Sequence, residues 1–314
     1  MAAKTWGGVA QKAIEEVFFQ NDAVSLCLLI NRRARTMRVI DFRAGPSNAK
    51  RLFVMSLAQR EGADKVFTLV ERDEVSTWVK LGFAKEGNVP GFYKRSDAFF
   101  LGAMVPPYAE SMSSGRSDEE PPDSDVRLAQ RPEALSPAME RMERTVAKGK
   151  RLAKEHGERA LPSVKVTAVH ESDTTKAVTL ALRTGRALTG FEAFGRDAER
   201  NYFVLTARGG FELVVSTEAQ GCFGNAFVEL LSSPRTEAER LATTAGLRVL
   251  FEKLLEGGVA GCFALAPSDD VALAAAFTFS GFRRTGLLHG QLVVGGERKD
   301  AILWARKLSN PTDE

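Results

Sequence analysis

The stretch that decides the fold is WVKLGFAKEGNVPGFYKRSDAFFLGAMV, residues 78–105, because its pattern returns in FTFSGFRRTGLLHGQLVVGGERKDAILWARKL, residues 277–308. In both segments Gly-Phe follows an apolar helical run, a second glycine comes five residues after the first, and Asp-Ala opens an apolar strand. A pattern that recurs in this way predicts that one unit, a helix followed by a hairpin, is built twice. The marks that define the unit are Gly82, Gly87 and Asp97 in the first copy and Gly281, Gly286 and Asp300 in the second.

Each copy closes a longer series of elements that hydrophobic periodicity predicts. In the first series we expect helix 10–21, strands 23–32 and 36–43, helix 48–59, buried strand 65–70, short helix 73–81 and a hairpin that bends near residues 88–91. In the second series we expect strand 164–170, helix 173–185, a meander over 202–208, 211–217 and 222–231, helix 236–256, strand 261–266, helix 269–280 and the second hairpin. The shared order of strand, long helix, buried strand, short helix and hairpin favours duplication of one mixed α/β (α+β) unit.

Between the two series lies a segment, residues 106–137, that holds six of the twelve prolines together with many serines and acidic residues. Such a composition buries too little apolar surface to offset its ordering entropy, so we expect a flexible, exposed linker. Residues 138–160 are strongly charged and predict a largely solvated helix with a thin apolar stripe. The predicted domains are therefore a truncated N-terminal one over 1–105 and a more complete C-terminal one over 161–314.

Composition places the chain among ordinary globular proteins, with 44% hydrophobic residues and a net charge of +3 over 314 residues. This near balance of charge gives no general case for nucleic-acid binding, and a solvated turn is the simpler explanation of the dense arginines in residues 31–38. Cys27, Cys222 and Cys262 lie in apolar runs, as the reduced core thiols of a cytoplasmic protein do. We expect no secretion signal and no membrane span, and the three histidines lie too far apart in the sequence to predict a metal site.

The order of elements resembles that of the GNAT superfamily of acyltransferases, whose members transfer an acyl group from acyl-CoA to an amine. The likeness is clearest at the endings, LGFAKEGNVPGFYKRSDAFFLG in the first series and GFRRTG with DAILWARKL in the second. It covers residues 164–308 as a nearly full domain and residues 10–105 as a shorter one that lacks the family's first strand. The resemblance implies two GNAT-like domains in tandem, with acetyl-CoA as acyl donor and an amine as acceptor.

In that family a glycine-containing turn before the long helix binds the CoA pyrophosphate through backbone N–H groups. The first copy of this turn reads FRAGPSNAKRLF, residues 42–53, where the spacing is wrong and the second glycine position is not matched. An anion would still be tolerated beside the basic residues there, and the alternative is a well-capped helix start with solvated cations. The residues that the resemblance implies for CoA binding are Arg43, Gly45, Ser47, Asn48 and Lys50.

The second copy of the turn reads LSSPRTEAERLATT, residues 231–244, and contains no glycine. Either Ser233 followed by Pro234, or Thr236 followed by Glu239 as a capping box, makes a good helix start. Glu237 and Glu239 would set negative charge where a pyrophosphate must lie, and would repel it. We therefore expect the phosphate site of the second copy to be lost.

Acid and base candidates are few. The family often uses a tyrosine in the short helix before Gly-Phe, but these helices carry Trp78 and Phe277 instead. Glu71 and Asp73 follow a buried strand, where open α/β sheets place functional groups, and either carboxylate could act as a base toward an amine. Helix capping is the simpler explanation of both, and Tyr93 is equally explained as an aromatic at the edge of the core. The predicted catalytic residues are Glu71, Asp73 and Tyr93, and the equivalent carboxylates of the second copy are Asp269 and Asp270.

Two functions stay open at this point. In the first, the protein is an N-acyltransferase in which one half binds acyl-CoA and the other helps to shape the amine pocket. In the second, both halves are catalytically inactive pseudo-acetyltransferases, and the protein is a regulator or scaffold that binds a protein partner. The missing glycines, the acidic helix start and the absent tyrosine favour the second. Binding of acetyl-CoA distinguishes the two.

Overall fold

The computed structural model describes residues 14–20, 25–41, 48–94, 96–106, 136–196, 198–219 and 223–309. The part that we call the N-terminal half contains β1 (Ile14–Gln20), β2 (Ser25–Asn31), β3 (Thr36–Asp41), α1 (Asn48–Arg60), β4 (Lys65–Val70), α2 (Val75–Lys80), β5 (Ala84–Val89) and β6 (Ala98–Met104). Helix α4 (Pro137–Gly157) follows. The part that we call the C-terminal half contains β7 (Val164–Val169), α5 (Glu171–Arg183), β8 (Glu199–Ala207), β9 (Phe211–Ala219), β10 (Asn225–Leu230), α6 (Glu237–Glu256), β11 (Gly261–Pro267), α7 (Val271–Phe279), β12 (Arg283–Val294) and β13 (Glu297–Lys307).

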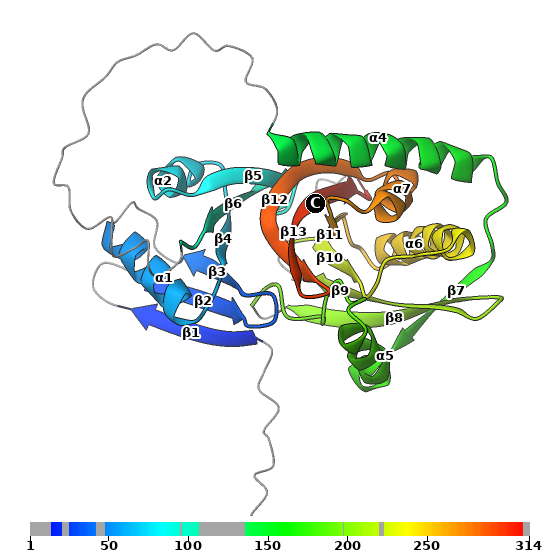
Figure 1. The fold of residues 1–314 in the computed structure, drawn as a ribbon, viewed down its shortest axis with the longest axis horizontal. Helices are drawn as coiled ribbons and strands as arrows, with labels where there is room; N and C mark the ends of the chain where they lie inside the picture. The colour runs from blue at the N-terminus through cyan, green and yellow to red at the C-terminus, as the bar shows by residue number, and fades with distance from the viewer. Residues whose placement is uncertain are drawn as a thin grey trace, which may run out of the picture.

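The described strands form one continuous sheet in the order β1-β2-β3-β4-β6-β5-β12-β13-β11-β10-β9-β8-β7 (Figure 1). Strands β1 to β6 of the N-terminal half match β8 to β13 of the C-terminal half in order and in pairing, with a single parallel pair in each half. Helices α1 and α2 occupy the places in the chain that α6 and α7 occupy in the second series. The predicted mixed α/β class and the shared order of elements are confirmed. Division into two domains stays a prediction, since both halves share one sheet.

The two halves join where β5 lies beside β12, and the residues paired there are Gly87 and Gly286. A side chain at Gly286 would put its Cβ 2.4 Å from the carbonyl oxygen of Glu86 and 2.5 Å from the Cα of Gly87. Only glycine allows two backbones to approach this closely. The second glycine of each repeated segment is therefore required, because the two copies meet backbone to backbone at this point.

The first glycine of each repeated segment ends a helix in the left-handed conformation. The backbone φ angle is 80° at Gly82 and 81° at Gly281, values that favour glycine at a helix C-terminus. The helix then packs an aromatic side chain on the phenylalanine that follows the glycine. Trp78 contacts Phe83 with 4.9 Å between ring centroids, and Phe277 contacts Phe282 at 5.2 Å.

Successive residues of each strand face different cores, as the two-residue period of a strand requires. Val228 of β10 belongs to the core beneath α4, α6 and α7, whereas the adjacent Phe227 points to the opposite face. In the same way, Val66 of β4 faces α1 and α2, and Phe67 faces away from them. Phe227 and Phe67 meet in one largely aromatic core to which both halves contribute. Figure 1 shows α4 along the top of the C-terminal half and α5 at its bottom.

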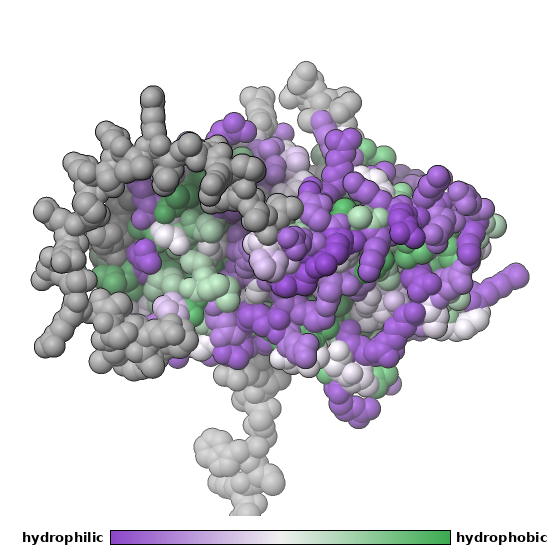
Figure 2. All heavy atoms as spheres, turned by 45° about the horizontal axis from the view of Figure 1, so that its top comes forward, coloured by the Kyte–Doolittle hydropathy of each residue, from purple (hydrophilic) through white to green (hydrophobic). Residues whose placement is uncertain are grey.

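The surface differs between the halves. Figure 2 shows apolar side chains gathered in a hollow on the N-terminal half, whereas polar side chains cover most of the C-terminal half in the same view. A hollow of about 890 Å³ lies beside α1 and the β5–β6 hairpin, and Leu52, Met55 and Met104 are among the residues that line it. Leu52 is 67% exposed. In the C-terminal half, α4 packs along α7, the counterpart of α2.

The predicted helix over residues 10–21 is wrong, because Ile14–Gln20 is strand β1, antiparallel to β2. Side chains there alternate between the two faces of the sheet. Val17 and Phe19 pack against the core of the N-terminal half, whereas Phe18 between them is 59% exposed. An alternation of this kind, with period two, fits a strand and not a helix.

The charged helix predicted over 138–160 exists as α4, and more than half of its residues are exposed, as expected. Met142 and Val146 belong to the core of the C-terminal half. Gly149 lies so close to α7 that a Cβ on it would be 2.8 Å from the Cβ of Ala274. Ser136 caps the helix by accepting a hydrogen bond from the Met139 N–H at 3.3 Å. The thin apolar stripe is thus a packing surface. Residues 107–135 of the predicted linker lie outside the described residues.

The arginine-rich turn before β3 is only partly solvated, since it contacts the C-terminal half. Arg33 forms an ion pair with Glu192, 159 residues further along the chain. Arg298 of β13 reaches back to this region, donating to Asp64 at 2.9 Å and to the carbonyl of Ala34 at 2.8 Å. The turn therefore helps to hold the two halves together.

Two of the three cysteines are buried free thiols, Cys27 and Cys262. This confirms the expectation of core thiols for these two residues. Burial raises the pKa of the Cys27 thiol to about 12, and a hydrogen bond to Glu16 adds to the shift. Cys222 lies outside the described residues.

Candidate functional site

The parallel strand pair of each half opens at its carboxyl end. Strands β3 and β4 pair over four residues and stop at Val39 and Thr68, and β10 and β11 pair over four residues and stop at Val228 and Ala264. The carboxyl ends of adjacent parallel strands are where α/β sheets place functional groups. In the C-terminal half, the residue after the last pair on β10 is Glu229.

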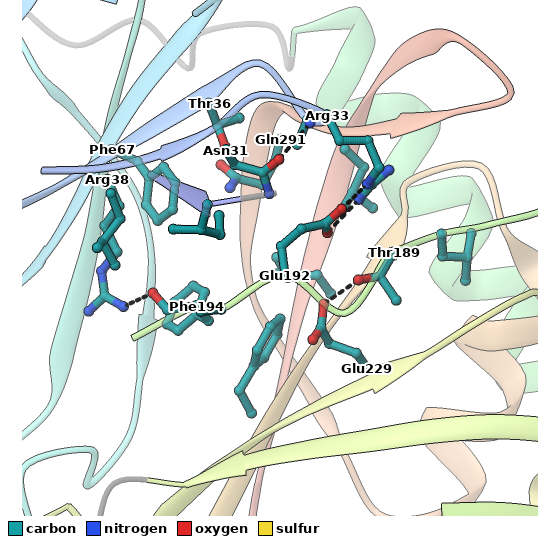
Figure 3. A pocket seen from close by; sticks show the side chains of 18 of the residues that line it. Asn31, Arg33, Thr36, Arg38, Phe67, Thr189, Glu192, Phe194, Glu229 and Gln291 are labelled. Carbon is teal, nitrogen blue, oxygen red and sulfur yellow. Dashed lines mark hydrogen bonds and ion pairs between the residues drawn. The ribbon is translucent and has the colours of Figure 1, made fainter. Parts of the chain in front are cut away.

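Glu229 lines a cavity that we call the junction cavity, which has a volume of about 80 Å³ and lies between the two halves (Figure 3). Three larger hollows, of about 510, 560 and 890 Å³, lie elsewhere on the protein. The junction cavity is smaller than each of these three hollows, but its lining combines buried charged groups with apolar walls, as binding sites do. Its polar lining comprises Asn31, Arg33, Thr36 and Arg38 from the N-terminal half and Thr189, Glu192, Glu229 and Gln291 from the C-terminal half.

The Glu229 carboxylate accepts three hydrogen bonds. Thr189 Oγ1 donates to it at 2.7 Å, Arg200 Nη1 at 2.5 Å and Ser216 Oγ at 3.4 Å. Burial raises the pKa of Glu229, and Arg200 and Thr189 only partly oppose the shift. A carboxylate in such a site is a stronger base than an ordinary glutamate, which makes Glu229 a candidate for proton transfer.

Glu192 has the opposite behaviour. Burial would raise its pKa, but the Arg33 guanidinium outweighs that effect, and the pKa of Glu192 lies below its usual value. Arg33 Nη2 donates to the carboxylate at 2.9 Å, and the Gly190 N–H donates at 3.1 Å. Glu192 therefore stays ionised and paired, and Figure 3 shows it between Arg33 and Glu229 on the wall of the cavity.

Arg200 bonds to the carboxylates of Glu229 and Glu218 and to the backbone of Glu192. In addition to Glu229, it donates to Ser216 at 2.7 Å, to the carbonyl of Glu192 at 2.8 Å, and to Glu218. Glu218 in turn accepts the N–H of Phe194 at 2.9 Å. This network fixes the segment before β8 against the sheet, and it has a structural role whatever else the cavity does.

Arg38 lies at the other end of the cavity. Its Nη1 donates to the carbonyl of Phe194 at 2.5 Å, and its guanidinium lies 4.4 Å from the centre of the Phe194 ring. Burial lowers the pKa of Arg38 to about 10, so it is still a cation at neutral pH. Arg38 Nε and Gln291 Oε1 are both buried, and neither has a hydrogen-bond partner among the described residues.

The predicted catalytic residues lie at the carboxyl end of β4, outside the lining of the junction cavity. Tyr93 donates to the carbonyl of Leu69 at 3.3 Å and packs edge-on against Phe223. Burial raises the pKa of Tyr93 to about 12. Glu71 is exposed and accepts a hydrogen bond from Ser96 at 3.0 Å. Asp73 is exposed in the turn before α2. The catalytic roles of these three residues stay predictions.

Most of the residues implied for CoA binding lie outside the described part of the chain, namely Arg43, Gly45 and Ser47. Asn48 is the first residue of α1. Lys50 is only 2% exposed, and its ammonium lies 4.6 Å from the centre of the Trp78 ring. Burial lowers its pKa, partly opposed by Glu74. Lys50 thus packs against α2, and its predicted contact with a phosphate is untested.

The start of α6 is built as predicted. Glu239 N–H donates to Thr236 Oγ1 at 3.1 Å, and the Glu239 carboxylate accepts from the N–H of Thr236 at 3.4 Å and of Arg235 at 2.6 Å. The Glu239 N–H, which Thr236 caps, is therefore not free for a pyrophosphate. The hollow of about 510 Å³ beside this turn has a mixed charged lining, which comprises Arg186, Arg235, Arg240, Lys299, Asp269 and Asp270.

Capping explains Asp270, because its carboxylate accepts the Leu273 N–H at the start of α7 at 2.9 Å. Asp269 is paired with Lys299 at 2.6 Å. The counterpart of Asp270 at the start of α2 is Glu74, whose side chain makes no capping bond. The simpler explanation is thus confirmed for Asp270.

Glu192 and Glu229 of the junction cavity were not singled out from the sequence, and Arg33 and Arg38 were interpreted only as part of a solvated turn over residues 31–38. A signal exists, since Arg38 stands between Met37 and Val39 in β3 and Glu229 stands between Val228 and Leu230 in β10. Charged side chains are almost never fully buried unless they are paired or bind something. A charge at an inward-facing strand position is therefore the feature that points to such a site.

Within the described ranges, no group of three or more His, Cys, Asp or Glu side chains is arranged to hold a metal ion. No helix in that part of the chain has the length and apolar character needed to cross a membrane.

No protein-family model matches the chain, and no curated protein matches it. Among solved structures, it is similar to the ribosomal-protein-S18-alanine N-acetyltransferase from Escherichia coli, at 19% identity over 48% of this chain and 98% of that chain, with a TM-score of 0.37. It is also similar to a spermidine N-acetyltransferase variant from Vibrio cholerae, at 12% identity over 46% of this chain and 94% of that chain, with a TM-score of 0.38. A ribosomal alpha-N-protein acetyltransferase in complex with coenzyme A matches at 13% identity over 47% of this chain and 96% of that chain, with a TM-score of 0.38.

Proposed function

We propose that this chain is an N-acyltransferase of the GNAT type whose amine acceptor binds in the junction cavity. The observation that carries the proposal is the buried carboxylate of Glu229, one residue past the last pair between β10 and β11. Its raised pKa makes it hold a proton more strongly than an ordinary glutamate does, as removal of a proton from an amine requires. The order of elements in each half, which is the order expected from the family resemblance, supports the same class.

The residues around Glu229 have distinct roles in this proposal. Thr189 and Arg200 orient the carboxylate through their hydrogen bonds, and the amine nitrogen of the acceptor gives its proton to Glu229. Tyr93 is a further proposed acid, and its pKa of about 12 keeps it protonated at neutral pH while making it a weaker acid than an ordinary tyrosine. Glu71 and Asp73 are further proposed bases, at the carboxyl end of the N-terminal half's parallel pair.

Acetyl-CoA is the proposed donor, and the start of α6 does not fit its pyrophosphate. The carboxylates of Glu237 and Glu239 lie in that first turn, and the Glu239 carboxylate already accepts the N–H groups of Arg235 and Thr236 just before it. The proposed donor contact therefore belongs to the N-terminal half. One half would hold the donor, and the cavity lined from both halves would hold the amine. The proposed donor contacts are Arg43, Gly45, Ser47, Asn48 and Lys50.

Isothermal titration of the full chain with acetyl-CoA and with coenzyme A tests the donor, and product formation from a panel of amines tests the transfer. We expect saturable binding near one donor per chain. Glu229→Gln should reduce transfer by about 10²–10⁴-fold, as loss of a general base does, with donor affinity unchanged. Glu212→Gln, an exposed glutamate in the same half, should leave both unchanged. Full transfer by Glu229→Gln would remove the role of Glu229, and absence of donor binding would remove the acyltransferase.

A second function, a catalytically inactive pseudo-acetyltransferase that binds a protein partner, is favoured by one observation. The first turn of α6 carries carboxylates and a complete capping box in place of the glycines that a pyrophosphate needs. Absence of acetyl-CoA binding, together with a stoichiometric protein partner whose binding survives Gly45→Val, would favour this function. Under either function the buried free thiols support a cytoplasmic location.

A further inference from the structure

Arg38 is a cation in a place where the fold itself calls for an aromatic side chain. Arg38 pairs with Phe67 in β3–β4, one residue before the last pair, and Phe227 holds the same place opposite Phe263 in β10–β11. Phe227 shows that a ring fills this position well in the mixed aromatic core. The arginine is therefore not explained by packing, which suggests a role in binding.

The contacts of Arg38 leave its charge without a counter-ion. It donates to the carbonyl of Phe194 and stacks on that ring, and no carboxylate among the described residues forms an ion pair with it. Glu218 acts on it only from a distance, because that carboxylate is bound to Arg200 and to backbone N–H groups. Arg38 Nε is buried and has no partner there. A buried cation in this state is stabilised when an anion binds beside it.

A second orphaned group lines the same cavity from the other half. Gln291 of β12 is 6% exposed, and its Oε1 is buried without a donor among the described residues. The lining of the cavity thus includes a donor without a partner, the Arg38 Nε–H, and an acceptor without a partner, Gln291 Oε1. Glu229 lines the same cavity. Phe67 and Leu265 contribute apolar wall between these polar groups.

We propose that the junction cavity binds a small molecule carrying both a carboxylate and an amine, with the carboxylate bound by Arg38 and N–H groups directed to Gln291 Oε1 and Glu229. An amino acid has this chemistry. A guanidinium suits a planar carboxylate because it can donate two parallel hydrogen bonds. The cavity volume of about 80 Å³ favours a small molecule over a peptide. This inference rests on the proposed function, since it names the class of acceptor for the same site.

The test measures binding without any acyl donor, so that it does not depend on catalysis. The full chain is screened by thermal shift and titration against the proteinogenic L-amino acids, against the alkylamines formed by their decarboxylation, and against carboxylic acids without an amine. We expect saturable binding of at least one amino acid and none of its decarboxylated amine. Arg38→Gln should weaken that binding by about tenfold or more, which corresponds to loss of one charge-assisted contact.

Arg208→Gln, the same change at an exposed arginine outside the cavity, should leave the affinity unchanged. The melting temperature of the free protein gives an independent readout. Because Arg38 has no counter-ion, Arg38→Gln should not lower it, whereas loss of a merely structural arginine would.

Each other outcome overturns the inference. If Arg38→Gln binds amino acids as the unchanged chain does, Arg38 is not the carboxylate contact. If alkylamines are acylated while no amino acid binds, the substrate class is wrong and the acyltransferase survives. If nothing binds and nothing is acylated, both proposals fail together.

Discussion

The two halves of the molecule place the same elements in the same order, but equivalent positions carry different chemistry. Counting from the last parallel pair of each half, Glu229 in β10 corresponds to Ile40 in β3, and Phe227 corresponds to Arg38. Each half therefore contributes one charged residue that the other half replaces with an apolar one. The scaffold accommodates either choice, and the two charged residues, one from each half, both line the junction cavity.

The first residue pair of the two parallel strands also carries different chemistry in the two halves. The first pair of β3 and β4 places Thr36 opposite Lys65, and that of β10 and β11 places Asn225 opposite Gly261. Lys65 is fully buried and donates to Glu86 at 2.6 Å, whereas a Cβ on Gly261 would lie 2.6 Å from Asn225 Oδ1. The same strand position thus holds an ion pair in one half and a glycine closely approached by the Asn225 side chain in the other.

The largest expected effect tests whether the halves unfold together. Trp78→Ala and Phe277→Ala each remove a fully buried aromatic from equivalent helices, and each should cost about 3–5 kcal/mol of the free energy of unfolding. Because one sheet runs through both halves, each change should shift a single transition seen by circular dichroism and calorimetry. Two transitions, each moved by one variant only, would mean that the halves are independent domains. Val79→Ala, at a half-exposed site on α2, is the control.

The next largest effect is expected at the buried ion pair of Lys65 and Glu86, whose place in the C-terminal half is held by Gly261. Lys65→Met leaves Glu86 buried without its partner and should lower the free energy of unfolding by about 3–5 kcal/mol. The double change Lys65→Met with Glu86→Gln should recover much of this loss in urea denaturation. A double variant as unstable as the single one would show that the charge on Glu86 is not what costs stability. Lys253→Met, at an exposed lysine of α6, should have little effect.

A smaller loss of stability is expected at Gly286, where β12 pairs with β5. Gly286→Ala would put a Cβ 2.4 Å from the Glu86 carbonyl oxygen, so β5 and β12 must separate, and we expect a loss of about 1–3 kcal/mol. Faster hydrogen exchange in β5 and β12 should accompany the loss. Gly257→Ala is the control, since a Cβ there meets its nearest atoms at 3.4 Å. Equal, small effects at both sites would refute the requirement for glycine at the junction.

The start of α6 gives a smaller change, specific to the C-terminal half. Thr236→Ala removes the side-chain oxygen that accepts the Glu239 N–H and should cost about 1 kcal/mol. Thr236→Ser keeps the cap and should restore most of the melting temperature. If the alanine variant is as stable as the original chain, the capping box does not stabilise this helix.

The smallest effect is a titration. The pKa of Tyr93 is raised from 10.0 to about 12, mainly by burial, so the folded state favours the neutral phenol. Stability from this residue is full below pH 10 and is lost as the pH rises toward about 12. Ultraviolet absorbance of phenolate should therefore show delayed ionisation in the folded protein, and Tyr93→Phe should remove one late step. Ionisation of all tyrosines near pH 10 would contradict the burial of Tyr93.

Much of the fold could be predicted from the sequence, because the period of a helix or strand is a local property. The capping box at Thr236 and the glycine that ends α7 were predicted for the same reason. Helix 10–21 was the failure, since Val17, Phe18 and Phe19 form a continuous apolar run in which only the sheet decides which residues face the core. A short apolar run does not distinguish helix from strand by period alone.

The candidate site was far less predictable. Glu71 and Asp73 are predicted from their place after a buried strand and Tyr93 from its place in the first hairpin, and both arguments take account of only one half at a time. Arg33 and Glu192 pair across 159 residues of chain, and no local pattern identifies such a partner. The charges at Arg38 and Glu229 were visible in the sequence between apolar neighbours, but what they face depends on the opposite half.

By itself, then, the sequence determined the order of elements, the repeated helix-hairpin unit and the capped start of α6, since these depend on residues within a few positions of one another. Only the tertiary structure decided why Gly87 and Gly286 recur, and which charges meet in the junction cavity. Both depend on how two halves of one sheet lie against each other. That arrangement is set by the packing of side chains distant in sequence, which local periodicity does not encode.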